Sequence, residues 1–256
     1  MRLLAAIGLT LLFAVGAGLG LALAVLIVPI SFYRRARAVH AEGVVCRGEL
    51  IARDPVAARL AGPVLVRLSG ALAAQTAGSD ILGVALRMQR TASDDARDGD
   101  QDLLLGSFES FHTVGRDRAR TDAGDYLANR YSTVTPWWLP GRGAVTLRLV
   151  PLPAPPGSAA PPPAPPGSAA PVADRLARLD AALAADRARL ALAIGTGPEA
   201  RGLAELRLIA RIATDDRALR TSMWRQGRGV RPLGLRNGIR ATLYPLSQIA
   251  RRLRGG

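Results

Sequence analysis

The residues whose side chains are best suited to carry out chemistry lie near the two ends of the chain. His40 stands in the segment RAVHAEG, where an imidazole could act as a general acid or base or be a satisfied polar group. Tyr244 follows Arg240 by four residues, which on a helix places guanidinium and phenol on one face. A neighbouring cation favours phenolate, and tyrosine is one of the axial ligands of haem iron. Taken alone, such a pair is more often structural than part of a haem site.

Composition excludes several other kinds of site. The 256 residues carry a formal charge of +14, and every basic residue is arginine. Cys46 is the only cysteine, which excludes a disulfide framework and a multi-cysteine metal site. His40 and His112 are too few for an all-histidine metal site, and no G-x-S-x-G, P-loop lysine or H-E-x-x-H motif occurs.

A long apolar segment opens the chain. Residues 3–30 carry no charge and would extend about 42 Å as a helix at ~1.5 Å per residue, more than the ~30 Å hydrocarbon core. The run is too long for a cleaved signal peptide, so residues 1–33 are predicted to be a retained, single-pass transmembrane anchor in the cell membrane. More arginines follow it than precede it, which predicts a cytoplasmic main domain. Gly16 and Gly20 form a G-x-x-x-G pair that could support helix dimerisation or be ordinary small residues.

The rest of the chain divides at a proline-rich repeat. Residues 34–150 are predicted to hold strands, among them 64–68, 81–88 and 144–150, whereas the acidic stretch 92–102 is predicted to be a solvated loop. Residues 151–160 recur almost unchanged as 161–170, so 151–172 is interpreted as an extended linker. Residues 173–194 are predicted to be helical and 203–214 a strand, within a segment 173–256 that completes the same domain.

Five short segments, in order, resemble motifs of the catalase superfamily. Residues 37–43 are similar to the family's distal-histidine segment, and residues 66–69 (VRLS) to its V-R-F-S strand. Residues 80–87 (DILGVALR) and 102–108 (DLLLGSF) resemble the next two motifs. Arg240-x-x-x-Tyr244, with Arg251 seven residues later, is similar to the proximal motif. The resemblance implies an α+β fold, a catalase-like antiparallel β-barrel with helices, and haem b as cofactor.

The same resemblance implies roles for individual residues. Tyr244 would ligate iron, His40 would exchange protons with the peroxide, and Ser69 would orient His40. Ser107 stands where the family has a distal asparagine. The remaining positions would contact haem, the arginines by binding its propionates or the phenolate: Arg37, Val39, Arg67, Arg240 and Arg251.

Two functions of different classes remain open. One is a membrane-anchored haem enzyme acting on hydrogen peroxide or a lipid hydroperoxide, with the bilayer and the peroxide as partners. The other is a non-catalytic catalase-like scaffold or accessory subunit of a membrane protein complex or homo-oligomer. A third, weaker interpretation makes the thirteen arginines from Arg201 onward a patch for anionic lipid or nucleic acid. Few aromatic residues lie among these arginines, so no nucleic-acid partner is expected.

Overall fold

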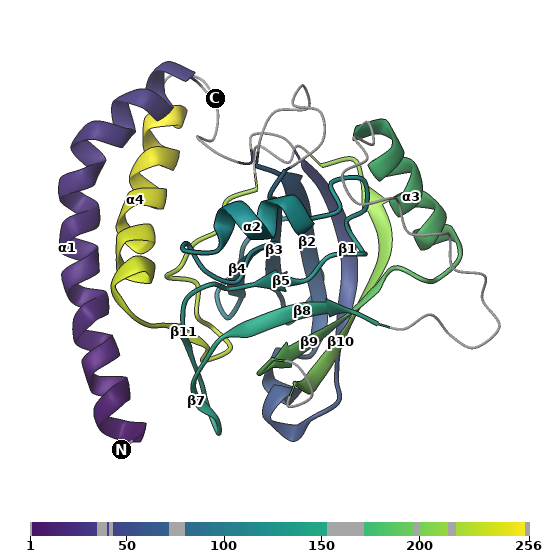
Figure 1. The fold of residues 1–256 in the computed structure, drawn as a ribbon, viewed down its shortest axis with the longest axis horizontal. Helices are drawn as coiled ribbons and strands as arrows, with labels where there is room; N and C mark the ends of the chain where they lie inside the picture. Colours follow the sequence, from purple (N-terminus) through teal and green to yellow (C-terminus); the bar gives the residue numbers. More distant parts are fainter. Residues whose placement is uncertain are drawn as a thin grey trace.

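The central part of the protein is an eight-stranded antiparallel barrel, with helices beside it (Figure 1). The computed structural model describes residues 2–34, 40, 43–71, 80–152, 172–196, 200–214 and 219–253. Going round the closed barrel, the strands are β1 (Gly43–Ala52), β10 (Arg201–Ile212), β9 (Arg189–Ile194), β8 (Leu147–Pro151), β5 (Tyr131–Ser132), β4 (Gln101–Gly106), β3 (Leu82–Met88) and β2 (Gly62–Gly70). A small second sheet has the order β11 (Arg231–Pro232), β6 (Trp137–Leu139), β7 (Gly143–Val145).

Strands from both sides of the proline-rich repeat build this one barrel. β9 and β10 follow the repeat in sequence, yet β9 pairs with β8 and β10 pairs with β1. Closure of the barrel therefore joins residues 34–150 and residues 173–256, the two segments that the sequence predicts to form one domain. β8 continues to Pro151 and α3 (Val172–Ala184) begins at Val172. Most of the predicted linker, residues 153–171, lies outside the described residues.

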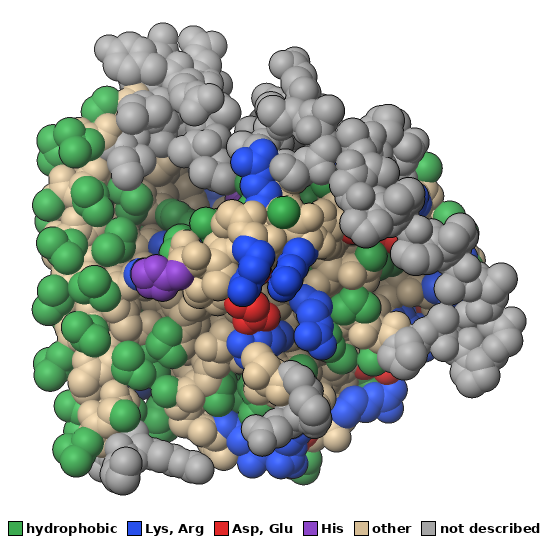
Figure 2. Space-filling view, viewed as in Figure 1, with side chains coloured by type: hydrophobic (Ala, Val, Ile, Leu, Met, Phe, Trp, Pro, Cys, Tyr) green, Lys and Arg blue, Asp and Glu red, His purple; other side chains and the backbone are tan. Residues whose placement is uncertain are grey.

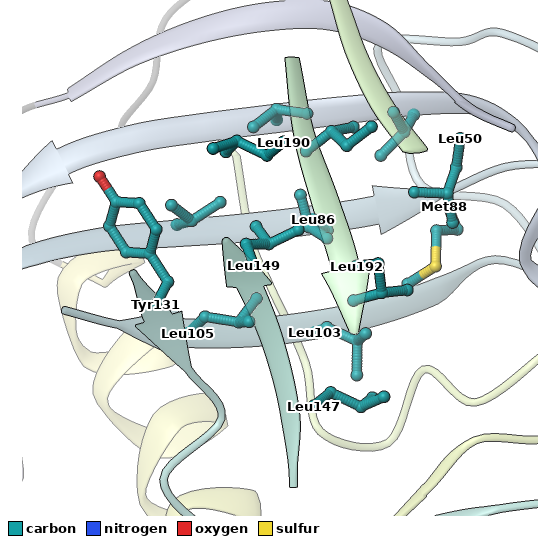
Figure 3. Packing of buried hydrophobic residues seen from close by; sticks show 14 of the residues in the cluster. Leu50, Leu86, Met88, Leu103, Leu105, Tyr131, Leu147, Leu149, Leu190 and Leu192 are labelled. Carbon is teal, nitrogen blue, oxygen red and sulfur yellow. The ribbon is translucent and has the colours of Figure 1, made fainter. Parts of the chain in front are cut away.

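Alternation along the strands separates a dry interior from an outer surface. Inward side chains such as Leu86, Leu103, Leu149 and Leu192 are fully buried and fill the barrel (Figure 3). Tyr131 lies among them and donates its hydroxyl proton to the Tyr126 carbonyl oxygen at 2.6 Å. Because successive side chains on a strand point to opposite sides, the residues that alternate with these leucines on each strand face the outside of the barrel.

The helix predicted over 173–194 is half wrong. α3 ends at Ala184, and Arg189–Ile194 forms strand β9. The chain turns at Asp186, which has a positive φ of 52°, and the Arg187 N–H donates to the Ala182 carbonyl at 2.8 Å. Leu190 and Leu192 then alternate into the barrel, so pairing with β8 and β10 overrides the local helical pattern. The strand expected at 203–214 is confirmed as β10, Arg201–Ile212.

Two long helices pack side by side next to the barrel. α1 (Arg2–Arg34) contains a stretch, Leu4–Leu26, long and apolar enough to cross a membrane. α4 (Leu235–Arg252) lies between α1 and the barrel (Figure 1). Two shorter helical segments, η1 (Pro55–Leu60) and α2 (Val114–Arg120), cap and flank the barrel. The cavity described next lies between the barrel and α4.

Candidate functional site

A cavity of about 400 Å³ lies between the outer surface of the barrel and helix α4. Its volume falls in the range of ~300–1,000 Å³ typical of small-molecule and cofactor sites. Strands β2, β3, β4 and β5 contribute one wall, and α4 contributes the other. His40 and Tyr244, the two residues that the sequence singles out for chemistry, both line it, together with Arg67, Ser69 and Arg240.

Three of the outward residues on the barrel wall of the cavity are small. Gly83, Ala85 and Gly106 occupy outward positions on β3 and β4 and line the cavity. A side-chain carbon at Gly83 would come within 2.6 Å of the His40 ring, and one at Gly106 would come within 2.6 Å of the Phe108 ring. Glycine at these positions therefore allows two rings to lie directly against the strand backbones.

His40 is held in an uncommon backbone conformation by several bonds. Its φ is 59°, in the left-handed region that few non-glycine residues adopt. The His40 N–H donates to the Ala71 carbonyl at 3.3 Å, and the His40 carbonyl accepts from the Arg67 guanidinium at 2.9 Å. Strained residues of this kind cluster at functional sites, where the surrounding structure holds them.

Ser69 connects the imidazole to the barrel. Its Oγ lies 3.1 Å from His40 Nδ1 and donates to the Gly83 carbonyl oxygen at 3.4 Å. A serine hydroxyl has one proton, so a hydroxyl that donates to the carbonyl accepts from Nδ1–H. In that tautomer Nε2 is the unprotonated nitrogen and can act as a base. The orienting role expected of Ser69 is therefore consistent with its geometry.

The α4 wall has the spacing of one helical face. Arg240, Leu243, Tyr244, Ser247 and Gln248 line the cavity, at positions i, i+3, i+4, i+7 and i+8. The Arg240 guanidinium also lies over the Phe111 ring, 5.6 Å from its centroid. The same-face placement expected for Arg240 and Tyr244 is thus present.

A proline directly after Tyr244 is accommodated by a tryptophan. Pro245 has no N–H, so the carbonyl of Ala241 loses its helical hydrogen bond. The indole N–H of Trp224 donates to that carbonyl at 2.8 Å. The Trp224 ring also meets the Phe13 ring edge-on at 5.7 Å, which ties this turn of α4 to α1. Tyr244 therefore sits at a turn of α4 that is fixed from the side away from the barrel.

Residues 219–230 connect β10 to β11 and close part of the cavity, with Leu219 and Thr221 in its lining. Asp102 attaches them to the barrel: its carboxylate pairs with Arg87 at 3.2 Å and with Arg225, and it accepts from the Ser222 N–H at 2.8 Å. Burial raises the pKa of Asp102, and the two guanidinium groups act in the opposite direction. This ion pair is structural and lies away from the cavity lining.

Ser107, expected to replace the distal asparagine, is placed elsewhere. Its neighbours Gly106 and Phe108 line the cavity, whereas the Ser107 hydroxyl accepts from the Leu82 N–H and bonds the Thr121 hydroxyl, both at 2.9 Å. Since side chains alternate along an extended chain, a residue beside Gly106 points to the other side. The Ser107 hydroxyl therefore points away from the cavity, and its bonds secure the end of β4. The catalytic role expected of Ser107 stays a prediction.

The remaining residues expected to contact haem are not all described. Arg67 lines the cavity and is buried. Arg37 and Val39 lie outside the described residues, and Arg251 lies in α4 but its side chain is not described. Cys46, close to His40 in sequence, is fully buried, and burial raises its pKa to about 12, so its thiol is not a nucleophile at neutral pH.

Sequence reasoning missed several polar residues of the lining. Ser132 and Thr133 come from β5 and the residue after it, Thr221 from residues 219–230, and Gln248 from α4. The Gln248 amide donates to the Thr221 carbonyl at 3.0 Å and joins two of these segments. Helical periodicity from Tyr244 could have indicated Ser247 and Gln248. Nothing in the sequence pattern brings the other two segments to the cavity.

Within the described part of the chain, no three His, Cys, Asp or Glu side chains gather as a metal site. Comparison with known proteins adds no family assignment. No protein-family model matches this chain, and no curated protein matches it. The residues and the cavity between the barrel and α4 are therefore the whole basis for the function proposed below.

Proposed function

We propose that this protein is a membrane-associated haem protein of catalase-like architecture that reacts with peroxides. The observation that carries the proposal is the convergence of His40 and Tyr244 on one cavity, although they lie at opposite ends of the chain. His40 comes before the first strand of the barrel and Tyr244 comes from the helix after the last one. An antiparallel barrel with an imidazole on one wall and a phenol on the other matches what the sequence resemblance implies.

The donor groups of the cavity suit haem b. Haem needs an axial ligand, apolar walls for the ring and cations for two propionates. Tyr244 offers a phenol oxygen, Arg67 and Arg240 offer guanidinium groups, and Ala85, Leu104 and Leu243 offer apolar surface. Gly83 and Gly106 let the His40 and Phe108 rings, which border the cavity, lie close to the barrel wall. When bound, haem would supply a redox centre that a peroxide can oxidise by two electrons.

The protein's own residues then have defined tasks. Arg240, one turn before Tyr244 on the same face of α4, would offer its guanidinium to a propionate. Arg67 would bind a propionate carboxylate while its bond to the His40 carbonyl holds the imidazole segment. His40 Nε2 would accept a proton from the incoming peroxide and return it to the departing oxygen. Ser69 would keep Nδ1 protonated, and so keep Nε2 as the base.

The first test is replacement of the proposed iron ligand. Purified protein supplied with haemin is expected to show a Soret band, and Tyr244→Phe is expected to lose or shift it because the phenol oxygen is gone. The control is Tyr126→Phe, which removes the oxygen of a buried tyrosine that does not line the cavity. Absorption spectra of the three proteins check this. A wild-type protein that takes up no haemin would exclude the proposal.

A non-catalytic scaffold is the second candidate, and the position of Ser107 favours it. A Ser107 hydroxyl engaged with Leu82 and Thr121 cannot help to position a peroxide. A scaffold would hold haem without turning over hydrogen peroxide or a fatty-acid hydroperoxide, or would hold none. Comparing turnover of these two peroxides by the haem-loaded protein separates the candidates and identifies the substrate class.

A further inference from the structure

The apolar helix α1 is covered along one narrow stripe only. Ala6, Gly16, Gly20 and Ala24 are buried, and their spacing follows one face of the helix. The rest of the helix surface is exposed and aliphatic, with Leu4 at 74%, Leu11 at 64%, Val15 at 56% and Val25 at 74% exposure. In Figure 2 hydrophobic side chains cover the edge of the molecule that α1 forms. Thr10, a polar residue on this helix, donates its hydroxyl to the Ala6 carbonyl at 2.9 Å, as lipid surroundings require.

The covered stripe is a close contact with α4, and the two helices run in the same direction. The backbone of Leu235 lies against Gly16, and that of Ile239 lies against Gly20, where a side-chain carbon would be 2.6 Å from the Ile239 carbonyl oxygen. The Thr242 hydroxyl donates to the Ala17 carbonyl at 3.0 Å. The small residues that could have served a helix dimer instead bring α4 and α1 together within one chain.

This packing sets the depth of α4 relative to the apolar stretch. The stretch Leu4–Leu26 has Val15 at its middle. Leu235 and Ile239 contact α1 at Gly16 and Gly20, so Arg236 lies at nearly the level of Val15 and Arg240 lies about 9 Å further along α1, at ~1.5 Å per residue. The Arg236 guanidinium points to the barrel side, over the Phe111 ring at 4.5 Å.

A membrane-crossing α1 would therefore carry the protein into the bilayer. Arg236 would lie near the bilayer centre, and Arg240 and the adjoining barrel surface would lie within the hydrocarbon core. Charged side chains are rare at that depth because burying them in hydrocarbon is unfavourable. With α4 packed along α1, a crossing orientation conflicts with the charges beside it, although α1 by itself is long enough to cross.

We propose that α1 lies in the plane of the membrane and inserts its outward face into one leaflet, with α4 and the barrel on the aqueous side. α1 is apolar all round and is amphipathic only as a pair with α4, which covers its inner face. Trp138 and Arg231 lie beside the N-terminal half of α1 and line a second hollow of about 340 Å³ with Ile7 and Leu11. An indole and a guanidinium at the edge of an apolar surface suit the headgroup layer.

This inference does not depend on haem, and the helix can be probed with single cysteines. The native Cys46 is fully buried with a pKa raised to about 12, so thiol reagents at neutral pH label only an introduced cysteine. Leu4→Cys, Leu11→Cys, Val15→Cys, Leu19→Cys and Val25→Cys place a fluorescent or nitroxide probe on the outward face of the full-length protein. Ala181→Cys, exposed on α3 at the far side of the molecule, is the aqueous control.

The measurement is probe depth in vesicles of phosphatidylcholine and phosphatidylglycerol. An in-plane helix gives similar, shallow depths at the five positions and none at Ala181→Cys. A profile deepest at Val15→Cys and shallow at Leu4→Cys and Val25→Cys would show a crossing helix and overturn the proposal. Probes that stay out of the lipid, or that pair between two copies of the protein, would overturn it as well.

A substitution on the outward face provides an independent readout. Val15→Arg is expected to weaken vesicle binding on the order of tenfold or more, because a charge then enters the acyl region. Ala181→Arg adds the same charge away from α1 and is expected to bind as the wild type does. Circular dichroism of both variants shows whether each is folded. Equal binding by two folded variants would contradict insertion of this face.

Discussion

At the scale of single residues, the site depends on a histidine whose orientation is set by its neighbours. His40 adopts a positive φ, its carbonyl is bound by Arg67, and its ring lies between Ser69 and Gly83. Each of these contacts acts on a different part of the residue. The imidazole is therefore positioned before any ligand arrives, as preorganised catalytic groups are.

Ser69 is the positioning residue that can be tested without removing the imidazole. Ser69→Ala is expected to keep haem, to lower peroxide turnover roughly tenfold and to change the pH dependence of turnover, because Nδ1 loses the partner that fixes its tautomer. Steady-state rates measured between pH 5 and 9 check this.

Ser107→Ala is the matched control for that experiment, since it removes a buried serine hydroxyl that bonds Leu82 and Thr121 away from the cavity. Its effect is expected on thermal stability and not on the pH profile. A pH profile unchanged by Ser69→Ala would remove Ser69 from the mechanism.

At the scale of elements, glycines decide how α1 and α4 meet. Gly20 lies against the Ile239 backbone, whereas Gly18 on the same helix has open space around it. Gly18→Ala is expected to leave stability unchanged or raise it by up to ~1 kcal/mol, since alanine favours helix. Gly20→Ala is expected to lower it by roughly 1–3 kcal/mol, because the added carbon forces two backbones apart.

Unfolding of the detergent-solubilised variants measures both changes. The fluorescence of Trp224, which contacts Phe13 and bonds the Ala241 carbonyl, reports on the contact between α1 and α4. Equal stabilities for the two alanine variants would mean that the helices are not in contact in solution.

Periodicity made some elements predictable and left others open. The strands around 64–68 and 81–88 could be recognised because both faces are largely buried, which produces an apolar run, and the strand at 203–214 because its partly buried face produces alternation. Leu190 and Ile194 fitted a helical stripe equally well, and only pairing with β8 and β10 makes them part of a strand. Local pattern cannot decide between two such options when the partner is far along the chain.

The candidate site was predictable to the extent that it lies in short motifs. His40, Ser69, Arg67 and Tyr244 could be identified from their segments, and the structure brings them to one cavity. Ser132 and Thr221 could not be identified, because no local spacing relates them to these motifs. The direction of the Ser107 side chain, away from the cavity, could not be predicted, because a motif gives a position in sequence but not the direction of a side chain.

At the scale of the whole molecule, carboxylates hold distant segments together. Asp54 accepts from the Val56 N–H and pairs with Arg142 at 3.1 Å and Arg201 at 2.6 Å, which joins the segment before η1 to the small sheet and β10. Asp186 joins the turn before β9 to β10 through Arg189 and Arg207. The Val56 hydrogen bond, then the arginines, lowers the pKa of Asp54, and the bond from Arg207 lowers that of Asp186.

These shifts predict acid sensitivity. A carboxyl group whose pKa is lower in the folded than in the unfolded chain stabilises the fold above its unfolded value of about 3.9, and this stabilisation is lost as pH falls through the folded value. Thermal unfolding is therefore expected to occur at similar temperatures between pH 7 and 5 and at falling temperatures below about pH 4. Asp186→Asn is expected to unfold at lower temperature at pH 7 and to differ less from wild type at pH 3. A difference that instead grows toward low pH would contradict this account.

The contact between α1 and α4 has a consequence for how the protein is made. α1 leaves the ribosome before the barrel, whereas α4 follows the last barrel strand, so the glycine stripe of α1 has no α4 to cover it while the rest of the chain is synthesised. During that interval α1 is an uncovered apolar helix, which insertion machinery, chaperones and other nascent chains can bind. Folding is therefore complete only after the last helix has been made and has packed against the first. A chain interrupted before α4 would lack both the cover of α1 and one wall of the cavity.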